Sequence, residues 1–335
     1  MSTRSRVLPR SIAAVAVMGL LLVGCSSGEG PDGGGSGEDQ AADSHDVETD
    51  YGTVTVPADP QRVVVLNYAL AGYLYDLDVP VTATIPEDAD ADQGEFSPFW
   101  SDDATEDGTE FLPWSVDGFD LEAILAIEPD LIVGGGIGFP LRQAEEVYDE
   151  LSDIAPTVLV GRELTTWEAQ YSFLAEDVFD KPEVYTEAVQ TYEARVTEVR
   201  ESITPPELPA AFLSIVGDGG AYALVESVGL PTVFADLGIE PAPIFADGDF
   251  EVYGGGGDMF ELSTEQVGQV ITQPSVFVMG FNGDTTDVAT LSENPVYAAL
   301  PAFQNERAYD LPYWVLRGDY DETMALLDIV EEQFS

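Results

Sequence analysis

The sequence predicts an α/β protein with two doubly wound lobes, which are bridged by a long helical connector. Short, continuous apolar runs alternate with helical periodicity in both halves of the chain, which is typical of βα units around a parallel sheet. Between the halves, residues 166–205 show helical periodicity and no strand pattern. Since 45% of the residues are hydrophobic, the chain has enough apolar side chains for a packed core.

The first lobe is expected over residues 51–165. Arg62-Val-Val-Val-Leu66 is an apolar run of the kind found in strands buried on both faces. Asp120-Leu-Glu-Ala-Ile-Leu-Ala-Ile127 has helical spacing, and Pro129 ends that helix. The full set of expected strands is 62–66, 79–85, 130–134 and 156–160, and that of expected helices is 69–76, 120–127 and 141–154.

The connector and the second lobe follow at residues 166–205 and 206–335. In the connector, apolar residues recur every three or four positions, and Pro182 is expected to begin a second helix, since proline is tolerated at a first helical position. In the second lobe, strands are expected over 211–216 and 275–279, and helices over 232–237, 263–271 and 320–334.

The N-terminus has the pattern of an export signal. Three arginines precede a short apolar run that ends in Leu22-Val-Gly-Cys25. Small or branched residues before a cysteine resemble the bacterial lipobox, which implies a lipoprotein signal peptide over residues 1–24 and a lipid on Cys25. The alternative is an ordinary cleaved signal with an incidental cysteine. Residues 25–50 are rich in Gly, Ser and acidic residues and predict a flexible tether, which contains the one histidine, His45.

The charge is strongly negative: 63 acidic residues stand against 11 basic ones, for a formal net charge of −52. Such a surface repels nucleic acid and anionic lipid, so we expect neither as a partner. The acidic residues are spread along the chain, and a surface of this kind suits a salty environment, where self-repulsion is screened.

The sequence offers little for catalysis. With the one histidine in the tether, neither a Ser-His-Asp nor a Cys-His arrangement can form, and zinc ligands of the His/Cys type are lacking. Gly134-Gly-Gly-Ile-Gly-Phe139 misses the last glycine of the dinucleotide fingerprint. We therefore expect a binding protein with no catalytic residues, no metal site and no cofactor of its own. A glycosidase and an acidic cell-surface scaffold remain as distant alternatives.

Several stretches, in this order, resemble the iron-siderophore and vitamin B12 binding lipoproteins, which are the substrate-binding subunits of one class of ABC importers. The resemblance covers nearly all of residues 51–335. The matching stretches are Gly52-Thr-Val-Thr-Val-Pro-Ala-Asp-Pro-Gln-Arg-Val-Val-Val-Leu66, residues 120–133, Tyr148-Asp-Glu-Leu-Ser-Asp-Ile-Ala-Pro-Thr-Val-Leu-Val160, Leu262-Ser-Thr-Glu-Gln266, Asn294-Pro-Val-Tyr-Ala-Ala-Leu-Pro-Ala302 and Asn305-Glu-Arg-Ala-Tyr309.

The resemblance implies an exported monomer, lipid-anchored on the outer face of a cell membrane of the Gram-positive type. It captures a ligand in a cleft between the two lobes and delivers it to a permease. One rigid helix between the lobes implies a small closure on ligand binding. A glutamate on each lobe docks against the permease in this family, and Glu122 and Glu265 hold the matching positions. The alternative for both is an ordinary solvated helix acid.

Ligand contacts are expected in the loops at the carboxyl ends of the strands. The residues singled out there, aromatic or basic, are Tyr68, Trp114, Arg142, Arg162, Trp167, Tyr222, Tyr253, Phe281, Trp314 and Arg317. Aromatic walls with a few guanidinium donors suit bulky, oxygen-rich ferric siderophores. For each arginine the alternative is a surface salt bridge, and for each tryptophan it is core packing.

Basic residues are so few that they favour a neutral or cationic hydroxamate complex over a triply charged catecholate. Iron would enter only as part of the bound siderophore. Haem or a corrinoid is the alternative ligand. The acidic, glycine-rich run 246–258 is expected to be either a mobile lid or a salt-adapted loop.

Overall fold

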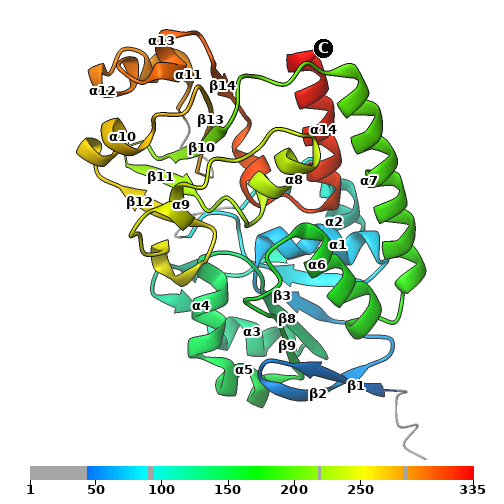
Figure 1. Cartoon of the computed structure of the whole chain (residues 1–335). Coiled ribbons are helices and arrows are strands. Elements are labelled where there is room, and N and C mark those ends of the chain that lie inside the picture. The colour runs from blue at the N-terminus through cyan, green and yellow to red at the C-terminus, as the bar shows by residue number, and fades with distance from the viewer. Residues whose placement is uncertain (1–43, 90–93, 218–219, 282–285) are drawn as a thin grey trace, which may run out of the picture. The chain divides into compact units, whose positions relative to one another are not determined.

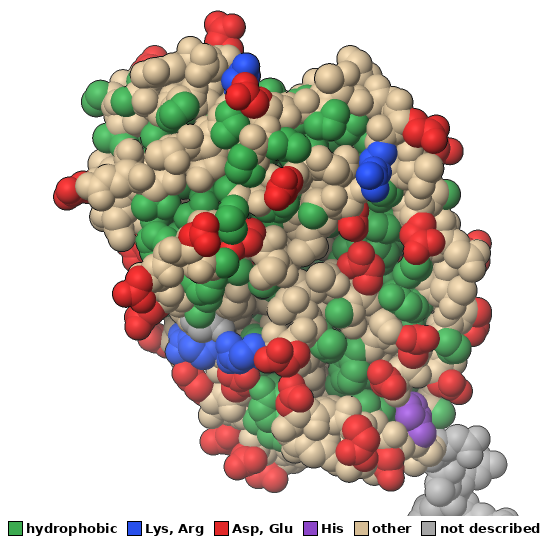
Figure 2. Space-filling view, in the orientation of Figure 1, with side chains coloured by type: hydrophobic (Ala, Val, Ile, Leu, Met, Phe, Trp, Pro, Cys, Tyr) green, Lys and Arg blue, Asp and Glu red, His purple; other side chains and the backbone are tan. Residues whose placement is uncertain are grey.

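The computed structural model describes residues 44–335, except 90–93, 218–219 and 282–285. The predicted signal peptide and Cys25 lie outside the described residues. Residues 41–335 form one compact unit. Within the part of the chain that is described, no helix has the length and apolar character needed to cross a membrane. Acidic side chains are spread over the whole visible face of the molecule, with few basic ones among them (Figure 2).

The first lobe is built on a parallel five-stranded sheet. In the order β5-β4-β3-β8-β9, its strands are Glu110–Phe111, Val81–Thr84, Val63–Val65, Leu131–Gly135 and Thr157–Val160. Successive side chains of a strand point to opposite faces, and both faces are covered here. Val63 and Val65 of β3 pack toward one layer of helices, whereas Val64 packs toward the other. The continuous apolar runs therefore mark strands buried on both faces, as predicted.

Helices cover both faces of this sheet (Figure 1). On the face of Val63 lie η1 (Tyr68–Leu70), α1 (Ala71–Asp76) and α2 (Ser101–Asp107), and on the other face lie α3 (Leu121–Ile127), α4 (Phe139–Glu146) and α5 (Tyr148–Ile154). Asp120 accepts a hydrogen bond from the Ala123 amide and so begins α3, a typical N-cap. The predicted helix 141–154 is two helices, since Val147 departs from helical geometry between α4 and α5.

The prediction of a flexible tether is wrong for its last residues. Residues Ser44–Thr49 form strand β1, which pairs antiparallel with β2 (Gly52–Pro57). Val47 and Val56 of this hairpin are fully buried in the core of the first lobe. One Val in an acidic stretch is too weak a pattern to be recognised without its partner strand. His45 lies on β1, where its Nε2 is 3.2 Å from the carbonyl oxygen of Asp177.

The connector begins with α6 (Trp167–Ser172), runs through a π-helical turn, η2 (Phe173–Val178), and continues as α7 (Pro182–Ser202). Pro182 is the first residue of α7, as predicted. The boundaries of the two lobes at residues 165 and 206 stay predictions.

The second lobe holds a mixed five-stranded sheet in the order β12-β11-β10-β13-β14. Its strands are β10 (Ala210–Ile215), β11 (Ala221–Leu224), β12 (Met259–Leu262), β13 (Ser275–Gly280) and β14 (Ala308–Asp310). β10, β13 and β14 are parallel, whereas β11 and β12 are an antiparallel edge. The antiparallel edge was not predicted, and it forms because the connection from Ile215 to Ala221 is too short for a crossover helix and makes a hairpin instead.

Helices also cover both faces of this second sheet. The helices of the second lobe are α8 (Leu230–Asp236), α9 (Ile244–Asp247), η3 (Tyr253–Gly255), α10 (Thr264–Val270), α11 (Val288–Leu291), α12 (Pro295–Ala298), α13 (Pro301–Gln304), η4 (Tyr313–Arg317) and α14 (Tyr320–Phe334). The predicted helix 320–334 coincides with α14. The predicted fold class is therefore confirmed: two α/β lobes with parallel strands.

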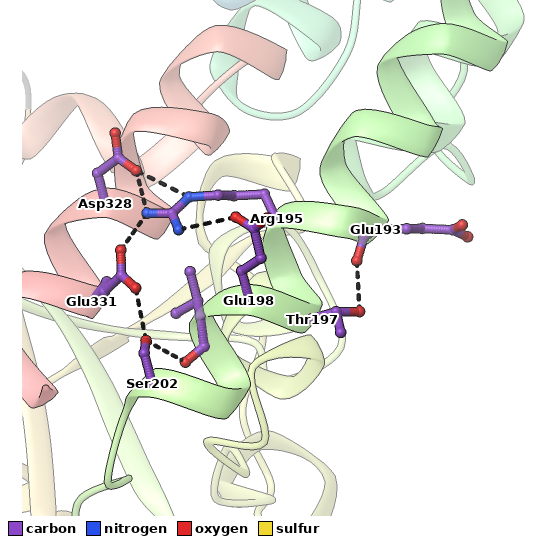
Figure 3. A network of polar contacts seen from close by, with 8 residues as sticks. Glu193, Arg195, Thr197, Glu198, Ser202, Asp328 and Glu331 are labelled. Atoms are coloured by element: carbon purple, nitrogen blue, oxygen red, sulfur yellow. Dashed lines mark hydrogen bonds and ion pairs between the residues drawn. The ribbon is translucent and has the colours of Figure 1, made fainter.

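One hydrophobic core runs through both lobes and the connector. It contains Val65 of β3, Val199 of α7, Phe277 of β13 and Leu327 of α14. On the surface, Arg195 of α7 joins α14 by ion pairs of 2.6 Å to Asp328 and to Glu331 (Figure 3). The C-terminal part of the connector thus packs on the last helix, an arrangement that favours small relative motion of the lobes.

Candidate functional site

A cavity of about 290 Å³ opens where the carboxyl ends of strands from both sheets meet. This is where ligands bind in open α/β sheets. The cavity is lined by residues that follow β3, β4 and β8 in the first lobe and β10, β13 and β14 in the second. Its described lining is Asn67, Tyr68, Ala69, Ile85, Pro86, Glu87, Asp88, Ala89, Trp114, Val116, Phe139, Pro140, Val216, Tyr222, Tyr253, Met259, Phe281, Tyr313, Trp314, Leu316, Arg317 and Glu322.

The first lobe supplies the aromatic rings of Tyr68, Trp114 and Phe139. Trp114 lies in β6 (Trp114–Ser115), which forms a short hairpin with β7 (Gly118–Phe119). The indole Nε1 donates to Gln143 Oε1 at 2.6 Å, and Gln143 Nε2 in turn donates to the carbonyl oxygens of the hairpin turn. The hydrogen-bonding end of the indole is therefore satisfied by the protein.

The second lobe supplies Tyr222, Tyr253 and Phe281. Tyr222 lies on β11, and its ring meets that of Tyr253 edge to face, with centroids 4.8 Å apart. Tyr253 belongs to η3 within the glycine-rich run and keeps 46% of its surface exposed. Rings held in pairs lose little conformational freedom when a ligand packs on them.

The segment η4 closes the floor of the cavity with Tyr313, Trp314 and Arg317. Trp314 is held edge to face by Phe99, at 4.9 Å between centroids. Arg317 Nε donates to Asp258 Oδ2 at 2.7 Å, and its guanidinium lies over the ring of Phe281 at 5.4 Å. Among the described lining residues, Arg317 is the one basic side chain.

Three carboxyl groups line the same cavity, those of Glu87, Asp88 and Glu322. Burial raises the pKa of Glu87 to about 7, with a further contribution from the Asp88 charge. Burial also raises the pKa of Glu322 well above its usual range, and Ser97 Oγ donates to its Oε1 at 2.9 Å. A second cavity of about 290 Å³ adjoins the first around these acids and adds residues Gly94, Glu95, Phe96, Ser97 and Pro98.

The structure therefore brings together seven of the ten predicted ligand residues: Tyr68, Trp114, Tyr222, Tyr253, Phe281, Trp314 and Arg317. Whether they contact a ligand stays a prediction. The sequence patterns did not indicate Glu87, Asp88, Glu322, Val116 and Met259, which also line the cavity. Many other residues of the chain are acidic or apolar, so residue type alone does not distinguish these five. Glu87 and Asp88 follow β4, and this position at a strand end was the one sequence signal for them.

The other three predicted residues do not line this cavity. Arg142 lies on α4, pairs with Glu146 at 2.7 Å and stacks on Phe139. Arg162 pairs with Glu145, also at 2.7 Å. Trp167 is 4% exposed, packs against Tyr192, and lines only a cavity of about 30 Å³ behind the cleft. Their placement in the cleft is thus corrected: salt bridges and core packing, the alternatives considered above, account for them.

The family model described as periplasmic binding protein matches residues 63–313, which contain both five-stranded sheets and most of the residues that line the cavity. The chain belongs to the periplasmic binding protein family. Members of this family bind substrates for transport and are not enzymes, so the expected binding role is supported.

Individual proteins resemble this periplasmic binding protein over nearly its whole length. The ferric enterobactin-binding periplasmic protein FepB of Escherichia coli is 28% identical over 98% of this chain and 100% of its own. The Fe(3+)-citrate-binding protein YfmC of Bacillus subtilis is 25% identical over 92% of this chain and 91% of its own. The crystal structure of holo-ViuP superimposes with a TM-score of 0.72 at 20% identity, covering 87% of this chain and 95% of that one, and so supports the fold.

Proposed function

We propose that this chain is the extracytoplasmic substrate-binding subunit of an ABC importer and that it captures a ferric siderophore in the cleft. The observation that carries the proposal is the aromatic cavity between the two lobes of a periplasmic binding protein. Relatives named for binding ferric enterobactin and ferric citrate point to iron complexes as the ligand class. Iron is the cargo in this proposal and enters as part of the siderophore complex, so the protein needs no cofactor.

A neutral or cationic complex of the hydroxamate type fits the charges of the cavity best. Arg317, the basic residue in the described lining, already pairs with Asp258, and three carboxyl groups face the same space. A triply anionic catecholate would meet the charge of Asp88 and part of the charge of Glu87, with one guanidinium that is already paired to offset them, which disfavours its binding.

Delivery to a permease is proposed to use Glu122 and Glu265. Glu122 lies in the first turn of α3 and Glu265 in the first turn of α10, one on each lobe, and both are exposed. Leu125, one turn beyond Glu122, is 58% exposed and adds apolar surface beside the acid. A basic permease surface would contact both lobes at once through these residues.

The lipid anchor on Cys25 completes the proposal, since a tethered binding protein stays near its permease. Metabolic labelling with a radioactive fatty acid tests this part. Label in the wild-type chain and its loss in Cys25→Ser are expected, whereas equal labelling of both would rule out an anchor at Cys25.

The ligand class is tested by intrinsic tryptophan fluorescence of the full chain in mild detergent and high salt. The titrants are ferric hydroxamates, ferric catecholates, ferric citrate, haem and cobalamin. Saturable quenching at micromolar or lower concentration by a ferric hydroxamate is expected. A response to haem or cobalamin alone would show that the ligand is not a siderophore. No response to any titrant would contradict the binding of an iron complex in the cavity.

A further inference from the structure

Arg317 lies at the junction of the two lobes. Its guanidinium packs so closely on Gly138 that a Cβ at this position would lie 2.6 Å from Cζ. On the other side, its Nε donates to Asp258 of the second lobe, and its plane covers Phe281. The Gly138 amide also donates to the Gly256 carbonyl oxygen at 3.2 Å. The basic side chain of the cavity is thus held in place by residues of both lobes.

Asp258 stands behind Arg317 and outside the cavity lining. It is 5% exposed and immediately precedes β12, where its carbonyl oxygen accepts from the Val225 amide at 2.9 Å. Its Oδ1 is buried and has no hydrogen-bond partner, so within the described residues the carboxylate has the one contact to Arg317. A half-satisfied buried carboxylate is costly for folding, and such a group calls for an explanation beyond stability.

We propose that Asp258 is a positioning residue that sets the charge preference of the cleft by neutralising and orienting Arg317. This inference rests on the proposed function and names Asp258 as the residue that produces the preference for neutral or cationic complexes. With Asp258 charged, Arg317 offers hydrogen bonds to an oxygen-rich ligand without adding net positive charge to the cavity. Asp88 and the ionised fraction of Glu87, whose pKa is raised to about 7, then determine the sign of the potential, which disfavours anionic complexes.

The variant Asp258→Asn tests this role because it keeps the side-chain shape and removes the negative charge. The probes are three ferric complexes: a triply anionic tris-catecholate, a neutral tris-hydroxamate, and a tris-hydroxamate with a free ammonium group. We expect D258N to bind the anionic complex about tenfold more tightly or better and the cationic one more weakly, with little change for the neutral one. The gain for the anionic complex is expected to disappear in the double variant D258N/R317Q.

Equal changes for all three complexes, or no change, would show that Asp258 has a structural role only. Thermal unfolding of D258N shows whether the variant is folded, and Asp249→Asn, an exposed acid of the same run, is the matched control that leaves the three affinities unchanged.

A second measurement needs no siderophore. Trp100, Trp167 and Trp114 are 3%, 4% and 9% exposed, so ionic quenchers reach mainly Trp314, which is more exposed and lines the cavity. Relative to the neutral quencher acrylamide, D258N is expected to increase quenching by iodide and to decrease quenching by caesium. Unchanged ratios would overturn the inference. If the wild-type chain binds none of the ferric complexes, the proposed function is wrong, and the quenching ratios still decide the electrostatic role of Asp258.

Discussion

Gly72 of α1 lies directly against the carboxylate of Asp319, the N-cap residue of α14. A Cβ at position 72 would come within 1.8 Å of Asp319 Oδ2, and within 3.2 Å of Trp100. Asp319 itself is fixed, because its Oδ1 accepts from the Glu322 amide at 3.0 Å in a capping box. This contact between the first lobe and the last helix leaves no room for a side chain. It lies just behind the cavity, since Glu322 lines that cavity.

The variant Gly72→Ala is therefore expected to destabilise the protein. Overpacking a tight contact costs about 1–3 kcal/mol of the free energy of unfolding, and the cost is measured by denaturant unfolding at high salt. Gly268→Ala is the matched control: Gly268 is also helical, but no atom lies within 4 Å of its added Cβ. That variant is expected to gain stability slightly. Equal stabilities of the two variants would contradict the tight contact.

Stability is expected to fall as the pH rises from about 5 to about 8. Burial, with the charges of Asp321 and Asp319, raises the pKa of Asp76 to about 8. Burial also raises the pKa values of Asp319 and Glu322. Between the ordinary carboxyl pKa near 4 and these raised values, the unfolded chain has released protons that the folded chain still holds, so each increase in pH favours unfolding.

Thermal unfolding in high salt measures this dependence, and Asp76→Asn tests its cause. The Tm of the wild-type chain is expected to drop by roughly 5 °C across this range, and D76N is expected to flatten the profile. Asp153→Asn, which changes an exposed acid of α5, is the control that keeps the wild-type slope. A wild-type Tm that rises with pH would contradict burial of these acids.

The ion pairs between α7 and α14 are expected to stabilise the packing of the connector. Arg195 Nη2 contacts both Asp328 and Glu331 at 2.6 Å, and Glu331 also accepts from Ser202 at 2.7 Å (Figure 3). Arg195→Ala leaves two neighbouring carboxylates facing each other. We expect its Tm to be a few degrees below that of Arg142→Ala, which removes one exposed i,i+4 pair. The difference is expected to shrink in molar salt, and a difference independent of salt would point to packing instead.

The sequence predicted the fold best where local patterns and burial agree. The run around Val64 and the amphipathic helix 320–334 each carry their own pattern, and both are confirmed. Strands β1, β11 and β12 were missed: β1 is mostly polar, and β11 and β12 are only four residues long, so each is recognised only with its neighbours in the sheet. The residues of a single segment do not determine such pairing with other strands.

The sequence predicted those residues of the candidate site that directly follow predicted strands. Aromatic residues such as Tyr68 and Trp314 follow predicted strands, and the carboxyl ends of parallel strands meet at one edge, so their convergence follows from topology. Glu322 reaches the cavity from the first turn of α14. In the sequence this helix follows η4 and not a strand, so no strand pattern indicated Glu322. Arg142 and Arg162 follow strands too, but ion pairs with Glu146 and Glu145 of α4 hold them outside.

Permease docking through Glu122 and Glu265 is tested with the charge-reversed double variant E122R/E265R. Like charges at a basic permease surface are expected to lower uptake of the ferric complex into cells by at least about tenfold, whereas ligand binding in solution stays at the wild-type level. Glu332→Arg, which reverses an exposed acid of α14, is the control with normal uptake. Normal uptake by the double variant would exclude these two residues as the docking pair.

Fluorescence quenching by the ligand is expected to come from two of the four tryptophans. Trp114 and Trp314 line the cavity, whereas Trp100 packs under Tyr68 and Trp167 against Tyr192. Replacing Trp114 or Trp314 with Phe should each remove a large part of the ligand-induced quenching, because energy transfer and contact quenching by a bound iron complex depend steeply on distance. Trp100→Phe should retain it. If Trp100→Phe abolished the signal while Trp314→Phe kept it, the ligand would bind away from this cavity, since only Trp314 of those two faces it.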